Sequence, residues 1–218
     1  MRVLMLTDCY PPHTGGGVEK VVSELVRGLL ARGHVVRVLT LLTRTAAAFE
    51  VDGDFSIRRL PAVDLTGLIG VQFVLPYGLL RGVRREVQEF KPDVIHAHNL
   101  FFRTTEAVAL LHRFFRVPLV TTLHLGALEG DERLLGLLVQ LYEATLGRYV
   151  MRVSNAVTAV SAAVAEHGGQ VSGARHRIQV IPNGVDTQVF QPGQFPEPPE
   201  IIFVGRLVPN KGPLTMIR

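Results

Sequence analysis

The sequence predicts an α/β protein in which a mostly parallel sheet is flanked by helices. Short, wholly apolar runs alternate with longer segments whose apolar residues recur at helical spacing, and polar or glycine-rich positions directly follow the apolar runs. Strand, helix and strand succeed one another at 3–6, 18–30 and 35–42, which forms a βαβ unit. Strands without polar alternation are typical of parallel sheets covered on both faces.

Composition limits the classes of protein that this chain can represent. With 218 residues, 47% of them apolar and 19% charged, it is globular, and its lone Cys9 fits a reducing cytoplasm. The net charge of +4 comes without the interleaving of basic and aromatic residues that nucleic-acid binding favours, so we expect no nucleic-acid partner. The apolar run 3–6 is too short for a signal peptide, and 65–80 is interrupted. We therefore expect a cytoplasmic protein that is soluble or peripheral at the inner face of the membrane.

The stretch 6–20 organises the rest of the chain. A strand passes through a proline-containing loop into three glycines that open a helix. The backbone at Gly16 and Gly17 can approach a ligand closely, and the first turn of the helix offers free N–H groups to an anion, most often a phosphate. On the local sequence alone, a plain strand-to-helix connection explains the pattern almost as well.

Histidines mark the ends of two predicted strands. Because ligands collect beyond the carboxyl ends of parallel strands, we expect His98 and Asn99 to line a cleft and His96 to be packed. His96 and His98 share a face and could ligate zinc, but no third ligand is evident nearby. His124 ends the next strand, where a histidine near its ordinary pKa can exchange a proton or hold a hydroxyl group. A structural histidine is the general alternative.

Two further segments have a functional and a structural interpretation. Asp52-Gly53-Asp54 could hold a divalent metal, but Asp-Gly favours a turn before a strand at 55–60. Residues 65–90 are apolar and then basic, which suits a helix lying on an anionic membrane. We favour a core helix whose polar side happens to be basic.

The later elements follow the same alternation. We expect a helix at 101–115 and a strand at 155–160, after which Ser161 caps a helix. A long helix is expected at 131–152, with its leucines directed inward: Leu134, Leu137, Leu138, Leu141 and Leu146. A proline- and glycine-rich linker then leads to a new strand at 201–204.

Five phrases, in order, resemble those of glycosyltransferase family 4, whose members are retaining enzymes of the GT-B fold that use nucleotide sugars. The phrases are Gly16-Gly17-Val18-Glu19, the His96-x-His98 strand, the strand end at His124, the segment 181–186, and Gly205-Arg206 with Lys211-Gly212. The resemblance implies a Rossmann-like amino-terminal, acceptor-side domain at 1–182, a linker at 183–199 and a truncated start of a nucleotide-sugar-binding domain at 200–218. The paired-glutamate motif of that second domain has no counterpart, so we expect little activity from this polypeptide alone.

The resemblance also implies a reaction: transfer of a sugar from a nucleotide diphosphate sugar to an acceptor hydroxyl, with retention and without metal or cofactor. It makes His124 the catalytic residue that faces the transferred sugar. The donor diphosphate is assigned to Gly16, Gly17, Arg206 and Lys211, and the acceptor side to His98, Asn99 and Glu19. The partners implied are a nucleotide sugar and a sugar, lipid-linked or small-molecule acceptor, and an anionic membrane surface is left open.

Two other functions are consistent with parts of the pattern. A non-catalytic fragment that binds a sugar or a partner is the main alternative. A nucleotide-dependent oxidoreductase shares βαβ units, but the Gly-x-Gly-x-x-Gly turn is not matched and no acidic residue ends the second strand near Leu42.

Overall fold

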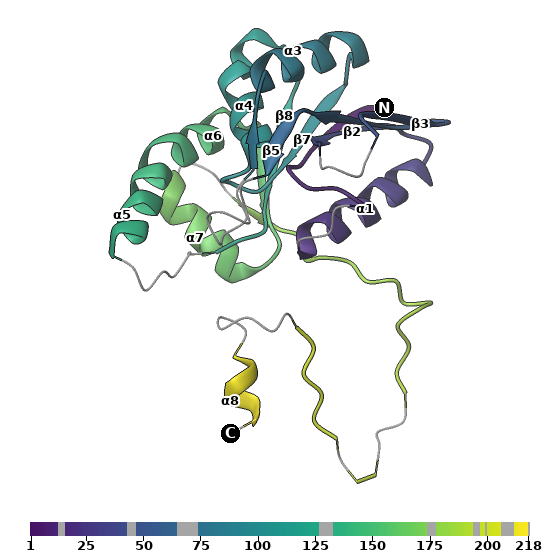
Figure 1. Cartoon of the computed structure of the whole chain (residues 1–218), viewed down its shortest axis with the longest axis vertical. Helices are drawn as coiled ribbons and strands as arrows, with labels where there is room; N and C mark the ends of the chain where they lie inside the picture. Colours follow the sequence, from purple (N-terminus) through teal and green to yellow (C-terminus); the bar gives the residue numbers. More distant parts are fainter. Residues whose placement is uncertain are drawn as a thin grey trace. The chain divides into compact units, whose positions relative to one another are not determined.

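A computed structural model of the chain comprises two units, Met1–Asn183 and Gly184–Arg218, which are described separately (Figure 1). The structure describes residues 1–12, 16–42, 47–64, 74–126, 133–173, 178–193, 197–198, 200–205 and 212–217. In the second unit the described helix is α8 (Pro213–Ile217).

An eight-stranded sheet forms the centre of the first unit. Its order is β10-β9-β8-β7-β1-β2-β4-β3, and every neighbouring pair is parallel except β3 and β4. The strands are β1 (Arg2–Leu6), β2 (Val35–Leu41), β3 (Phe49–Asp52), β4 (Phe55–Leu60), β7 (Val94–His98), β8 (Leu119–Leu123), β9 (Ala156–Ala159) and β10 (Gln179–Val180). A separate antiparallel ribbon joins β5 (Ala62–Asp64) to β6 (Val74–Pro76). The predicted Rossmann-like α/β class is confirmed.

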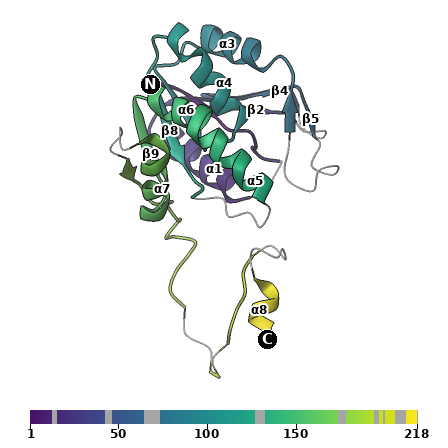
Figure 2. The ribbon, with the colours of Figure 1, turned by 90° about the vertical axis from the view of Figure 1, so that its left-hand side faces the viewer.

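Helices cover both faces of this sheet, with α3 and α4 on one side and α1 on the other (Figure 1). The helices of the first unit are α1 (Gly17–Leu30), α3 (Leu79–Phe90), α4 (Arg103–Leu111) with a 3-10 turn at His112–Phe114, α5 (Arg133–Tyr142), a π turn at Glu143–Gly147, α6 (Arg148–Val153) and α7 (Ala162–Ser172). Figure 2 shows α5 and α6 continuing as one rod.

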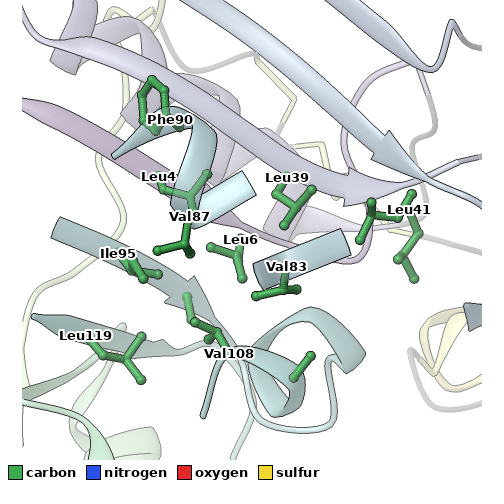
Figure 3. Close-up of a cluster of buried hydrophobic side chains, with 13 residues drawn as sticks. Leu4, Leu6, Leu39, Leu41, Val83, Val87, Phe90, Ile95, Val108 and Leu119 are labelled. Atoms are coloured by element: carbon green, nitrogen blue, oxygen red, sulfur yellow. The ribbon is translucent and has the colours of Figure 1, made fainter. Parts of the chain in front are cut away.

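The alternation of side chains along β1 accounts for the two-sided core. Leu4 and Leu6 point to the α3–α4 face, where Val87 and Phe90 of α3 complete a cluster (Figure 3). Val3 and Met5 point to the opposite face and pack on α1. A strand whose two faces are both buried reads as an unbroken apolar run, and this explains the sequence at 3–6.

Several local predictions are confirmed. Asp52 and Phe55 pair across a hairpin in which Gly53 is left-handed at φ 55°, so the Asp-Gly phrase forms a turn. The Ser161 hydroxyl accepts the Val164 N–H at 3.3 Å and caps α7. α3 buries Val83, Val87 and Phe90, so it is the core helix that we favoured, while residues 65–73 lie outside the described part.

Two predictions are wrong. Leu137, Leu138 and Leu141 were expected inside but are 62%, 56% and 61% exposed. The buried residues described in the later part of the rod are Gly147 of the π turn and Val150 and Met151 of α6, so these leucines lie outside the core. The side chain of Leu134 lies outside the described part, and that of Leu146 is partly buried.

Residues 201–204 do not form the expected strand. Within the described residues no strand pairs with them, and Ile201 and Val204 are almost fully exposed. A β-strand requires a neighbour for its backbone hydrogen bonds, and an apolar run alone does not supply one.

Adjacent glycines in α7 give a test of the packing next to β8. A Cβ at Gly168 would stand 2.6 Å from Leu123 Cδ1 and 2.8 Å from Ile178 Cδ1, whereas nothing lies within 4 Å of one at Gly169. Crowding of a packed site lowers the free energy of unfolding by about 1–3 kcal/mol. Replacing an uncrowded helical glycine by alanine raises it by up to about 1 kcal/mol, because alanine favours the helix. We expect Gly168→Ala to lower the free energy of unfolding and Gly169→Ala to raise it, measured by urea denaturation. Equal changes in the two variants would contradict the packing described.

Candidate functional site

The candidate site lies where the direction of strand order reverses. β1 has β2 on one side and β7 on the other, and the chain builds the sheet outward first through β2 and later through β7. Open parallel sheets bind ligands beyond the carboxyl ends of their strands at such a point. Polar residues lie at or just beyond the carboxyl ends of β1, β7 and β8 here: Asp8, His98 with Asn99, and His124.

His98 and His124 are joined directly. β7 and β8 are parallel neighbours in which His98 aligns with Thr122, so the two strand ends lie side by side. His98 Nδ1 and His124 Nε2 are 3.1 Å apart, at hydrogen-bonding distance. The sequence predicted that both histidines lie at strand ends, and the structure brings their rings together.

His96 extends this pair into a row of three imidazoles. Its ring centroid lies 4.3 Å from that of His98, and its Nε2 is 2.7 Å from the Thr122 hydroxyl. His98 is only 1% exposed and His96 is partly buried, which reverses the exposures expected from the sequence. His98 is covered because the chain turns directly into α4, where the Thr105 hydroxyl donates to the His98 carbonyl at 2.9 Å.

Burial keeps all three imidazoles neutral. Desolvation lowers the pKa of His96 and of His124 to about 4, and it lowers the pKa of His98 well below its usual value. Of the two roles expected of His124, a pKa this low disfavours proton exchange near neutral pH and favours hydrogen bonding to a hydroxyl group. At pH 7 its ring acts as a neutral hydrogen-bonding group.

The turn after β7 is strained and tightly held. Asn99 and Phe101 adopt left-handed conformations at φ 67° and 63°, which are costly for residues other than glycine. Asn99 is 2% exposed, donates its N–H to the Thr122 carbonyl at 2.7 Å, and accepts the His124 N–H on Oδ1 at 3.4 Å. The Phe101 ring stacks on Tyr142, whose hydroxyl accepts the Phe101 N–H at 2.8 Å. Strain that surrounding contacts over-determine is typical of functional sites.

Asp8 is a site residue that the sequence analysis did not single out. Its carboxylate accepts the N–H groups of Arg103 and Thr104 at 2.7 and 2.9 Å, and the Thr104 hydroxyl at 2.7 Å. Asp8 thereby caps the start of α4, although it lies 95 positions before Arg103 in the chain. Burial raises its pKa, against the lowering effect of these hydrogen bonds. The sequence did contain a signal for Asp8, since a polar residue close to the end of an apolar strand is the pattern that identified His98.

The glycine-rich helix end is partly described. Gly16 precedes α1 in an extended conformation without a side-chain cap, and the space that a Cβ at Gly17 would occupy is free of described atoms within 4 Å. Glu19, expected on the acceptor side, is 4% exposed, and its Oε2 stands 3.6 Å from the Cβ position of Gly16. Its burial in the first turn favours a structural role. Residues 13–15, Arg206 and Lys211 lie outside the described residues.

No metal centre and no membrane-spanning helix is found in the described part of the chain. Within it, no three or more His, Cys, Asp or Glu side chains gather as metal ligands would. His96 and His98 each have a ring nitrogen engaged by Thr122 and His124. Across the same residues, every helix is too short or too polar to cross a membrane.

The lowered histidine pKa values predict acid sensitivity. Between pH 6.5 and about 4 the unfolded chain binds protons that the folded histidines do not, so stability falls as pH falls, by about 1.4 kcal/mol per pH unit for each excess proton. The raised pKa of Asp8 acts in the opposite direction, because the folded state holds that proton more tightly. We expect His124→Gln to unfold with a shallower pH dependence than the unsubstituted protein in urea titrations from pH 7.5 to 4. Identical slopes would show that His124 is not desolvated.

The Asp8 cap predicts a large effect of one carboxylate. Asp8→Ala leaves three donors at the start of α4 without their acceptor, and we expect a loss of about 2 kcal/mol in the free energy of unfolding. Asp93→Ala is the matched control, because the Asp93 carboxylate accepts the Arg2 N–H at an exposed position. Its loss should be well under half as large. A similar loss in both variants would argue against the cap as the anchor of α4.

The sequence of this chain is similar to those of known glycosyltransferases. The family model described as Glycosyltransferase Family 4 matches residues 15–189. The D-inositol 3-phosphate glycosyltransferase of Nocardiopsis dassonvillei is 29% identical over 238 residues, which cover 95% of this chain and 53% of that protein. Glycogen synthase of Mycobacterium tuberculosis is 27% identical over 242 residues, covering 97% of this chain and 56% of that protein.

A solved structure shows the same architecture. Anabaena Alr3699/HepE in complex with UDP superposes with a TM-score of 0.52 at 18% identity, over 87% of this chain and 46% of that one. This likeness concerns the fold alone. The chain spans about half the length of the curated relatives described above. On its family match and its sheet, the chain belongs to glycosyltransferase family 4, of the GT-B type.

Proposed function

We propose that the native protein containing this chain transfers a sugar from a nucleotide diphosphate sugar to an acceptor hydroxyl, with retention of anomeric configuration. The observation that carries the proposal is the linked pair of His98 and His124 beyond the parallel strands of a family 4 chain. The relative named for D-inositol 3-phosphate and the relative named glycogen synthase support a hydroxyl-rich acceptor, which is a sugar, a small molecule or a lipid-linked sugar.

In this proposal, charge on the leaving diphosphate is stabilised by donors and cations of the chain, without a metal. Gly16 and Gly17 would contribute the N–H groups at the start of α1, where no side chain caps the helix and the space at Gly17 is open. Glu19 already places a carboxyl group in the first turn of that helix, which weakens its attraction for an anion. The proposal therefore assigns most of the positive charge to Arg206 and Lys211.

The role proposed for His124 is to orient a hydroxyl group of the transferred sugar. Its lowered pKa favours a neutral ring at pH 7, and its main-chain N–H is held by Asn99. Asp8 cannot serve as a nucleophile in its observed arrangement, because its carboxylate already accepts three hydrogen bonds and is buried. The chemistry proposed thus depends on positioning and electrostatic stabilisation and does not use a covalent enzyme intermediate on Asp8.

Kinetics of a histidine variant in the native protein test this function. Loss of one well-placed hydrogen-bond donor typically lowers kcat about 100-fold or more, and we expect His124→Ala to show this loss in a radiolabelled sugar-transfer assay. His34→Ala is the matched control. His34 precedes β2, at the amino ends of the parallel strands, whereas His124 lies at their carboxyl ends, so this variant should retain activity. Thermal melting of both variants separates the catalytic effect from unfolding.

Three outcomes would contradict the proposal. Equal turnover by the His124→Ala and unsubstituted proteins would remove the assigned role. Calorimetric binding of a nicotinamide dinucleotide, in place of nucleotide sugars, would indicate an oxidoreductase. Binding of a sugar acceptor with no transfer by the native protein would indicate a non-catalytic binding module.

A further inference from the structure

The hydrogen bond between His98 and His124 leaves a choice between two proton arrangements. A neutral imidazole carries one N–H, so in a pair joined through Nδ1 of His98 and Nε2 of His124 only one ring donates. If His98 donates, its Nε2 is bare and His124 carries its proton on Nδ1. If His124 donates, His98 carries its proton on Nε2 and His124 Nδ1 is bare.

The surroundings of His98 decide between these arrangements. Its Nε2 is buried and has no hydrogen-bond partner among the described residues. A proton on that nitrogen would make it a buried donor without an acceptor, and buried N–H groups are almost always paired in folded proteins. A bare acceptor nitrogen is the more tolerated exception, so the arrangement in which His98 donates through Nδ1 is favoured.

We propose that His98 is a positioning residue that fixes His124 in its Nδ1–H tautomer, so that His124 offers a donor to a hydroxyl oxygen of the bound sugar. This inference rests on the proposed function and adds the polarity of the contact. It makes the ligand atom at His124 an acceptor, and it excludes a hydroxyl that donates to a bare Nδ1.

The contacts of both rings restrict their orientation, as the selection of one His124 tautomer requires. The His98 ring packs against the His96 ring at a tilt of 32°, and the Thr105 hydroxyl anchors the His98 carbonyl. His124 is anchored by Asn99 at its main-chain N–H, and its ring is partly exposed. Desolvation keeps both rings neutral, which suits an uncharged hydroxyl better than a phosphate, since a phosphate would favour the imidazolium.

Nitrogen NMR of the ¹⁵N-histidine-labelled chain without ligand tests the tautomer directly. Long-range proton–nitrogen correlations distinguish a protonated ring nitrogen from a bare one, and loss of one set of signals in His124→Gln assigns that ring. We expect His98 and His124 both to be protonated on Nδ1 at pH 7. A proton on Nε2 of His124 would overturn the proposal. Because no substrate is present, absence of transferase activity would not affect this result.

Two ring-preserving substitutions on the same strand sharpen the test. His98→Phe removes the donor and keeps a ring, so we expect His124 to shift to the Nε2–H tautomer that an unconstrained histidine side chain favours. His96→Phe is the control, because His96 bonds Thr122 and not His124, and it should leave the tautomer unchanged. An unchanged His124 in His98→Phe contradicts the proposal, and if that variant does not fold, the unsubstituted spectrum decides.

Inorganic phosphate serves as the contrasting probe. Titrated into the labelled chain at pH 7, it should leave the His124 nitrogens in their neutral pattern. Protonation of His124 by phosphate would show that the site serves an anion, and would overturn the assignment to a hydroxyl oxygen.

Discussion

The three hydrogen bonds that Asp8 accepts at the start of α4 hold together the edge of the sheet on which the candidate site is built. They tie the end of the central strand β1 to the helix that follows β7. β1 and β7 are neighbours at the point where the strand order reverses. The bonds therefore fix the turn between β7 and α4 at that point. A buried carboxylate is costly unless it is well bonded, and the N–H groups of an uncapped helix are costly unless they meet an acceptor. The hydrogen bonds between Asp8 and α4 offset both the burial of the carboxylate and the lack of acceptors at the helix start.

The same junction determines the electrostatics of the site. With the turn closed over it, His98 loses contact with water, and the rings of His96 and His124 are desolvated beside it. Three imidazoles can be packed this closely only as neutral groups, since a charge on one would be destabilised by burial and would face repulsion from any second charge. A ligand bound beside these rings would meet neutral hydrogen-bonding groups and not histidine charge.

The class of fold followed from the sequence because parallel strands buried on both faces leave an unbroken apolar signature, as at β1 and β2. The strand-end rule likewise indicated His98 and His124, since strand register alone brings their backbones together. Burial was harder to infer. Whether His98 or His96 faces solvent depends on the turn into α4. That turn is held by Asp8, which lies 95 positions before Arg103 at the start of α4. The outward leucines of α5 were missed because helical spacing shows which residues share a face but not whether another element covers that face.

Residue identity in the strained turn is best explained by what the side chains do there. Glycine at position 99 would relieve the left-handed backbone, which costs about 1–3 kcal/mol for other residues. It would also remove the Oδ1 acceptor that bonds the His124 main chain. Phe101 bears comparable strain and is compensated by its stacking on Tyr142 and by the hydroxyl that accepts its N–H. Asn99 therefore holds the ends of β7 and β8 in fixed relation, while Phe101 ties the same turn to α5. The contact between His98 and His124 requires the two strand ends to stay within the reach of one hydrogen bond.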